Sequence, residues 1–323
     1  MKRCPTGLCG VLAIDKPSGV TSHDVVNSVR RITGERRVGH AGTLDPLATG
    51  LMLVGVGAAT RLATYLTGHD KAYRARFVFG VATDTDDAQG RVLEPYGAER
   101  LEERLAALGA VRPQATCAAL VGSTQQLPPA YSAIKKNGVA AYKAAREGTP
   151  IELQPRQVSI YEAHLEGSGQ VRERLATVDG GVVEVQLPCW DVYLRVSKGT
   201  YIRSIARDLG AQLGCGAHVG ALRRVAVGDC RIERACTLQQ LQRCVQRGEE
   251  LPWCDPAELL GFPVLELDEG QVADVSNGRQ LHAQAAGPQV SCVAQHKLLA
   301  VYTPNGATLR PATVIPGGVV GVA

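Results

Sequence analysis

The chain has 323 residues, which exceeds one typical domain, so we expect two domains that can each bury a core. A composition of 45% apolar and 20% charged residues is ordinary for a globular protein and excludes disorder of the whole chain. The net charge of +4 permits a nucleic-acid partner but does not establish one.

Membrane and secreted classes are disfavoured. No apolar run approaches the roughly 20 residues of a membrane span, and Pro5 and Gly7 interrupt any signal-peptide core near the start. The ten cysteines form no Cys-x-x-Cys pair, which disfavours a zinc ribbon, and the chain is too large for a small disulfide framework. We therefore expect a cytosolic protein with reduced thiols.

The first elements alternate between strand and helix. Apolar runs at 10–14 and 51–56 predict two buried strands. Between them, Ser22 can cap a helix that ends before Gly34. A further helix is predicted over 60–66.

From Tyr73 the side chains alternate with a period of two, which predicts a strand with one buried face. The residues on the apolar face are Tyr73, Ala75, Phe77, Phe79 and Val81, and Arg74 and Arg76 share the other face.

The middle of the chain continues as a mixture of helices and strands. Thr200 is predicted to cap a helix over 201–209 that Gly210 ends. Further helices are predicted over 101–108, 143–147 and 238–245, and strands over 158–165, 182–187 and 192–196.

Beyond about Pro252 the texture changes, because Gly and Pro become frequent and the apolar stretches shorten. Short strands are predicted at 264–267, 290–293 and 298–302. With a boundary near residues 248–256, we expect a mixed α+β catalytic domain over 1–250 and a small β-rich domain over 251–323.

The segment 39–50, Gly-His-Ala-Gly-Thr-Leu-Asp-Pro-Leu-Ala-Thr-Gly, contains a candidate reactive carboxylate. Its three glycines allow backbone conformations that other residues avoid, and Pro46 pushes Asp45 into an extended conformation. A carboxylate fixed in such a loop can act as a nucleophile or a general base. On this pattern alone, an Asp-Pro turn whose aspartate bonds its own backbone is the favoured interpretation.

Basic residues precede that loop, and they favour a functional role for it. Arg36 and Arg37 lie outside the predicted helix and suit a polyanionic partner such as RNA. Arg30 and Arg31 are explained equally well by the dipole at the end of that helix.

A second candidate is 197–203, Ser-Lys-Gly-Thr-Tyr-Ile-Arg, where a strand turns into a helix. A buried Arg203 could pair with a carboxylate such as Asp45 and keep it ionised. The alternative is an ordinary turn with Arg203 at the surface. Tyr73 is a core tyrosine or a stacking platform for an unstacked base, and His218 and Leu222 line a pocket or simply pack.

Six ordered segments resemble the bacterial tRNA pseudouridine synthase B family. They are Asp15-Lys16-Pro17-x-Gly19 with Thr21-Ser22; Gly39-His40-x-Gly42-Thr43-Leu44-Asp45-Pro46-x-Ala48-x-Gly50; Lys71-x-Tyr73; Pro128-Pro129-x-Tyr131-Ser132-Ala133-x-Lys135; Ser197-Lys198-Gly199-Thr200-Tyr201-Ile202-Arg203; and His218-Val219-x-x-Leu222-Arg223-Arg224. One alone could be chance, but the ordered set over residues 10–224 is highly specific.

The resemblance implies isomerisation of the T-loop uridine at tRNA position 55 to pseudouridine, with no metal and no cofactor. It implies that Asp45 is essential, that Arg203 pairs with it, and that Tyr73 stacks on the flipped base. His40, Tyr201 and Leu222 would then contact the flipped nucleotide or its surroundings. Lys16-Pro17 is interpreted as a buttress for the loop.

The implied fold is a largely antiparallel mixed sheet of the pseudouridine synthase type, followed by a PUA-like β module that grips tRNA. We expect a monomer that binds the T-arm and elbow of tRNA and uses no guide RNA and no membrane. Residues 167–188 are longer than this family usually carries there, so an added hairpin or loop is expected.

Three alternatives remain at this stage. The first is a non-catalytic tRNA-folding or RNA-binding protein on the same scaffold, against which the intact Asp45, Tyr73 and Arg203 argue. The second is a guide-dependent synthase, which should carry extra extensions and a more basic tail. The third is a glycosidase, whose chemistry usually needs two carboxylates.

Overall fold

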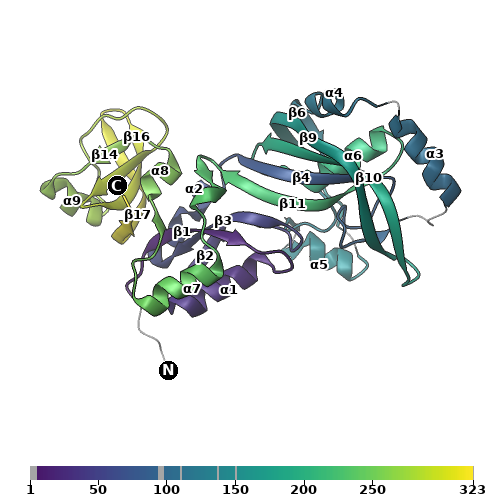
Figure 1. Cartoon of the computed structure of the whole chain (residues 1–323). Coiled ribbons are helices and arrows are strands. Elements are labelled where there is room, and N and C mark those ends of the chain that lie inside the picture. The colour runs from purple at the N-terminus through teal and green to yellow at the C-terminus, as the bar shows by residue number, and fades with distance from the viewer. Residues whose placement is uncertain (1–5, 94–97, 110, 137, 150, 323) are drawn as a thin grey trace. The chain divides into compact units, whose positions relative to one another are not determined.

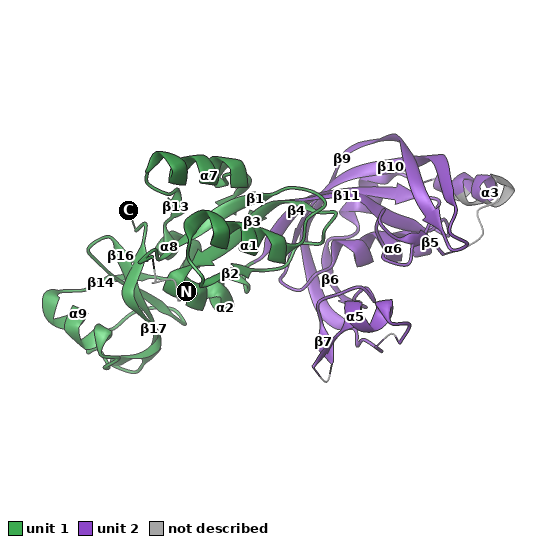
Figure 2. Cartoon of the chain, turned by 90° about the horizontal axis from the view of Figure 1, so that it is seen from below, with its two compact units in different colours: residues 1–69, 226–323 green, residues 70–225 purple. Residues whose placement is uncertain are grey.

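The computed structural model describes residues 6–93, 98–109, 111–136, 138–149 and 151–322 (Figure 1). The chain divides into two compact units (Figure 2). Unit 1 comprises residues 1–69 and 226–323, and unit 2 comprises residues 70–225.

Four paired antiparallel strands underlie unit 1. β1 (Gly10–Lys16) pairs with β3 (Thr49–Val56) on one side and with β13 (Trp253–Cys254) on the other, and β2 (Val38–Ala41) also pairs with β3. The strands predicted at 10–14 and 51–56 are thereby confirmed.

Side-chain alternation along β1 decides what covers each face of this sheet. Leu12 and Ile14 pack against α1 (Ser22–Thr33) and α7 (Leu238–Arg247) in one buried core. Val11 and Ala13 point the other way, into a core shared with the C-terminal strands. The predicted helix over 238–245 is confirmed as α7.

The start of α1 corrects one prediction. Thr21, not Ser22, is the N-cap: its side chain accepts from the backbone N–H of Asp24, and the Asp24 carboxylate accepts in return from Thr21. Ser22 is already helical, and its hydroxyl is used elsewhere. The end at Gly34 is confirmed, with a left-handed φ of 71°.

A four-stranded sheet completes unit 1. Its order is β14 (Val264–Glu266), β15 (Val290–Ala294), β16 (Lys297–Asn305), β17 (Thr308–Val320), with β14 parallel to β15 and the other pairs antiparallel. The three predicted C-terminal strands are confirmed, and β17 was not predicted. A division of the chain at residue 250 stays a prediction.

The remaining elements of unit 1 are short. The helix predicted over 60–66 is a 3₁₀ turn followed by one α-helical turn. The elements are η1 (Gly57–Leu62), α2 (Ala63–Leu66), β12 (Cys230–Arg231), η2 (Ile232–Arg234), α8 (Pro256–Leu260) and α9 (Glu269–Ser276).

Unit 2 is built on a larger mixed sheet, in the order β11-β4-β10-β9-β5, with β6 also pairing with β9. Among the strand pairs of this sheet whose register is described, β5 and β9 run parallel and the others run antiparallel. The strands are β4 (Lys71–Phe79), β5 (Arg91–Val92), β6 (Gly122–Gln126), β9 (Arg156–Thr177), β10 (Val182–Val196) and β11 (Ala217–Val227). The predicted class, α+β with a mixed and largely antiparallel sheet, is confirmed.

The long β9–β10 hairpin corrects one prediction and confirms another. The strands predicted at 182–187 and 192–196 are one continuous strand, because Cys189–Asp191 pair with both β4 and β9. Residues 167–188 lie in this antiparallel hairpin, as expected, and the turn contains Gly180 at a φ of 87°.

Helix α6 (Ile202–Gln212) also differs from its prediction. Its N-cap is Tyr201, not Thr200, and Gly210 lies inside the helix. A Cβ at Gly210 would lie 2.3 Å from the backbone nitrogen of Ala217, at the start of β11. The glycine therefore allows α6 and β11 to approach closely and does not end the helix.

Smaller elements complete unit 2. The helices predicted over 101–108 and 143–147 are confirmed as α3 and α5. The elements are α3 (Ala98–Gly109), α4 (Pro113–Ala118), β7 (Lys135–Lys136), β8 (Val139–Ala140) and α5 (Ala141–Arg146).

Candidate active site

Asp45 lies in the loop between β2 and β3, half-buried. Gly42 and Gly50, at the two ends of the loop, have φ values of 98° and 103° that other residues rarely adopt. The backbone carbonyl of Asp45 accepts from the N–H of Ala48 at 3.1 Å. This contact closes a backbone turn over residues 45–48.

Ser22 holds the residue directly before Asp45. Its hydroxyl donates to the carbonyl of Leu44 at 3.0 Å and accepts from the Leu44 N–H at 2.8 Å. Leu44 is buried, so water does not compete for these two backbone groups. The first turn of α1 therefore anchors the Asp45 loop.

Lys16 holds the residue directly after Asp45. Its buried ammonium donates to the carbonyls of Pro17, Val20 and Pro46 at 3.0, 2.7 and 3.3 Å. The N–H of Gly19 donates to the same Pro46 carbonyl at 2.9 Å. These contacts match the interpretation of Lys16-Pro17 as a buttress.

His40 lies on β2, on the strand that leads into the Asp45 loop. It pairs with Val54 of β3 and is half-buried. Unit 1 thus contains two of the six predicted site residues, His40 and Asp45.

The other four lie in unit 2. Tyr73 is on β4, opposite Leu194, and Leu222 is on β11, the neighbouring strand in the sheet. Both side chains are buried. Tyr201 precedes α6, and the guanidinium of Arg156 lies 5.4 Å from the centroid of its ring.

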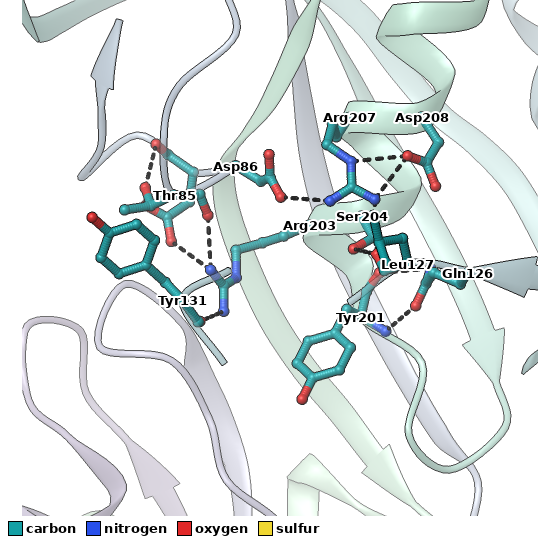
Figure 3. Close-up of polar contacts among 11 residues, drawn as sticks. Thr85, Asp86, Gln126, Leu127, Tyr131, Tyr201, Arg203, Ser204, Arg207 and Asp208 are labelled. Atoms are coloured by element: carbon teal, nitrogen blue, oxygen red, sulfur yellow. Dashed lines mark hydrogen bonds and ion pairs between the residues drawn. The ribbon is translucent and has the colours of Figure 1, made fainter. Parts of the chain in front are cut away.

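Gln126 fixes the backbone of Tyr201. Its side-chain amide accepts from the Tyr201 N–H at 2.8 Å and donates to the Tyr201 carbonyl at 3.1 Å (Figure 3). This paired contact joins the end of β6 to the start of α6 and sets where the tyrosine ring begins.

Arg203 is buried, which excludes the surface alternative. Its guanidinium donates to the carbonyl of Thr85 at 2.7 Å and of Tyr131 at 2.9 Å (Figure 3). It also lies 3.8 Å from the carboxylate of Asp87. A buried charge needs such partners. They hold the positive charge of Arg203 in place in the first turn of α6. The pairing of Arg203 with Asp45 stays a prediction.

The turn that supplies two of these partners, Thr85 and Asp87, was not predicted from the sequence. It lies at Thr83–Gly90, after β4, where Asp86 and Asp87 are both buried. Burial raises the pKa of the Asp86 carboxyl to about 6, although Arg207 and Arg203 oppose the shift. Three aspartates among the four residues 84–87, after an aromatic strand, were the available signal.

His218 packs in the interior of unit 2. It is buried on β11, with its Nδ1 at 2.8 Å from the carbonyl of Val81, and burial lowers its pKa.

Two buried cations also lie in unit 2. Lys71 and Arg224 are almost inaccessible to solvent. Burial, followed by the nearby Arg224, lowers the pKa of Lys71 to about 8.

A metal-binding cluster and a membrane-spanning helix are both absent from the part of the chain that the structure describes. There, no cluster of three His, Cys, Asp or Glu side chains could hold a metal ion. No helix within the same residues is long and apolar enough to cross a membrane. The nine described cysteines are free thiols.

Known proteins match almost the whole chain. Residues 30–202 match the family described as TruB family pseudouridylate synthase (N terminal domain). Residues 203–255 match the tRNA pseudouridylate synthase B C-terminal domain, and residues 262–316 match tRNA pseudouridine synthase II, C terminal.

Curated relatives agree with these family matches. The tRNA pseudouridine synthase B of Thermobifida fusca (strain YX) is 41% identical over 309 residues, covering 95% of this chain and 99% of that protein. That of Leifsonia xyli subsp. xyli is 43% identical over 289 residues, covering 88% of each chain.

Solved structures share the fold at low sequence identity. An H/ACA RNP bound to a substrate RNA containing 2′-deoxyuridine has a TM-score of 0.62 at 22% identity, covering 95% of this chain and 84% of that one. An archaeal box H/ACA sRNP Nop10-Cbf5 complex has a TM-score of 0.62 at 21% identity, covering 95% and 86%. Since the first family match spans more than half of the chain and the curated relatives span most of it, this chain belongs to the TruB family of pseudouridylate synthases.

Proposed function

We propose that this chain isomerises the uridine at position 55 of tRNA, in the T-loop, to pseudouridine. The observation that carries the proposal is the anchored loop of Asp45, with Ser22 holding the residue before the aspartate and Lys16 holding the residue after it. A carboxylate held this firmly suits a reaction in which it must meet one sugar carbon. The name and high coverage of the Thermobifida fusca relative support the same substrate.

The uridine must leave its stack before a side chain can reach its glycosidic bond. Tyr73, on β4, supplies an aromatic face that offsets part of the lost stacking. His40, Tyr201 and Leu222 contact the flipped nucleotide or its surroundings.

The chemistry is an isomerisation that needs no metal and no cofactor. The Asp45 carboxylate either attacks C1′, so that a C1′–O bond forms as the C1′–N1 bond breaks, or takes a proton from the sugar as that bond breaks. The uracil turns, and a bond forms from C1′ to C5 while the C1′–O bond breaks or the proton returns to the sugar. C5 then loses its proton, with Tyr73 assisting, and N1 gains one, so the composition is unchanged. Arg203 pairs with Asp45.

Cationic residues support tRNA as the partner. Arg36 is exposed beside α1, and the exposed Arg37 donates to the hydroxyl of Thr60 at 2.8 Å. Arginines in such positions suit phosphates of the T-arm. We further propose that residues 251–323 grip the acceptor-stem side of the tRNA, and that the protein acts as a cytosolic monomer without a guide RNA.

Incubation with an unmodified tRNA transcript tests the function. Pseudouridine is mapped by carbodiimide adducts, and a transcript with cytidine at position 55 is the control. We expect one adduct, at position 55, in the uridine transcript only. Binding of the transcript without any adduct would favour a tRNA-folding protein and would reject the proposed reaction.

A further inference from the structure

In unit 2, the neighbouring residues Asp86 and Asp87 lie beside two arginines on one face of α6. Arg203 and Arg207 are four residues apart on α6, so their side chains share a face. The Asp87 carboxylate lies 3.8 Å from Arg203, and the Asp86 carboxylate accepts from Arg207 at 3.1 Å (Figure 3). The Thr85–Asp87 turn therefore contacts two successive turns of the helix.

The backbone of Asp86 is strained. Its φ is 61°, a left-handed value that only Gln295 and His296 share among the non-glycine residues described. Its N–H donates to Thr83 at 3.2 Å, and its carbonyl accepts from Val219 at 3.0 Å. Glycine could make the same backbone contacts without strain, so the backbone does not explain an aspartate here.

The side chain of Asp86 has a partner that reaches further. Arg207 also donates to the carbonyl of Leu127 at 2.8 Å and to the Asp208 carboxylate at 2.9 Å (Figure 3). Ser204 donates to the same Leu127 carbonyl at 2.9 Å. Arg207 thus joins the Asp86 turn, α6 and the segment that begins at Leu127.

These are the same segments that hold Arg203. The Thr85 carbonyl is next to Asp86 in the chain, and the Tyr131 carbonyl lies four residues after Leu127. Moving either segment would move an acceptor of the Arg203 guanidinium. A side chain that fixes both segments therefore fixes the direction of that guanidinium.

We propose that Asp86 and Arg207 form a positioning pair for pseudouridine formation, which orients Arg203 without either residue touching the substrate. This inference rests on the proposed function. It assigns a role to the strained aspartate that the mechanism above leaves unused.

The charged surroundings of Asp86 give the pair a pH signature. From α6 it faces Arg203, Arg207 and Asp208, and Asp84 and Asp87 belong to its own turn. His218, on the adjoining β11, is buried and favours its neutral form. Because the pKa of Asp86 is raised to about 6, the pair is ionised at neutral pH and is lost as the pH falls through that value.

Asp86→Asn tests the proposal, with Asp191→Asn as the matched control. Asp191 forms an exposed pair with Arg76 at 2.8 Å in the same unit. For Asp86→Asn we expect kcat to fall about tenfold, with the Kd for tRNA changed less than about twofold. The decline of kcat in wild type below pH 6 should be absent from this variant, and Asp191→Asn should match wild type.

Asp86→Gly and the double variant with Arg207→Gln complete the test. Asp86→Gly relieves the strain, so its kcat should fall like that of Asp86→Asn even if its Tm does not. The double variant should be no slower than Arg207→Gln alone, since each single change already removes the same ion pair. A kcat within about twofold of wild type for both Asp86 variants, or an unchanged pH profile, would overturn the proposal. An inactive wild type would instead reject the proposed function.

Discussion

At the scale of single residues, two side chains outside the Asp45 loop hold its backbone in place. Ser22 is the one whose removal leaves both backbone groups of a buried residue, Leu44, without their hydroxyl partner. We expect Ser22→Ala to lower the free energy of unfolding by about 1–3 kcal/mol, and to lower kcat about tenfold through displacement of Asp45.

Ser18→Ala is the control for this change, because Ser18 donates to the Leu47 carbonyl at 3.2 Å from an exposed position. Its effect on stability should stay within about 0.5 kcal/mol. Urea unfolding and single-turnover rates measure both quantities. Equal losses in the two variants would show that the Ser22 contact does not anchor the loop.

The lowered pKa of Lys71 predicts that the stability of the protein depends on pH. Its pKa falls from 10.5 in the unfolded chain to about 8 in the folded protein, first through burial and then through Arg224. The unfolded state therefore binds more protons between these values, and the Lys71 contribution to the free energy of unfolding rises over that pH range.

The comparison is with Lys71→Met, which removes the titrating group. The stability of wild type minus that of the variant should increase from about pH 8 to 10.5, as measured by urea unfolding at each pH. Using the difference removes the opposing titration of the buried cysteines. Two parallel curves would mean that the pKa of Lys71 is not lowered.

At the scale of elements, α6 depends on its close approach to β11. Gly210→Ala would place a Cβ 2.3 Å from the Ala217 nitrogen, so the helix must shift. We expect a loss of about 1–3 kcal/mol in stability, together with lower activity because Arg203 lies on the same helix. Gly167→Ala, where a Cβ meets nothing within 4 Å, should be tolerated. Thermal unfolding and initial rates compare the two, and similar Tm values would contradict the packing argument.

The same helix shows where sequence patterns stop being informative. Gly210 has the chemistry of a helix end, but its role is set by Ala217, which the chain brings back only in the fold. Periodicity predicted β1, β3 and β4 correctly because each has a buried face that alternation or an apolar run reveals. β17 contains two prolines and two glycines, which are not typical of a strand, and its pairing with β16 was not visible locally.

At the scale of the whole molecule, the family and Asp45 were predictable because short ordered motifs contain them. The surroundings of Arg203 were not, since its acceptors lie 118 and 72 residues away along the chain. Asp86 and Asp87 belong to a turn with no hydrophobic period, and only the fold reveals which arginine each one meets. Sequence motifs thus identified the family and the candidate reactive group, and tertiary structure showed what holds the loop of that group in place.

The account as a whole depends on Asp45, and Asp45→Asn tests it most directly because the side chain keeps its shape and loses its charge. The measurement is pseudouridine at position 55 of an unmodified tRNA transcript, beside the Kd for the same transcript. We predict that Asp45→Asn binds tRNA with a Kd within about twofold of wild type and forms no pseudouridine over many wild-type turnovers. Turnover by Asp45→Asn at the wild-type rate would contradict the central claim.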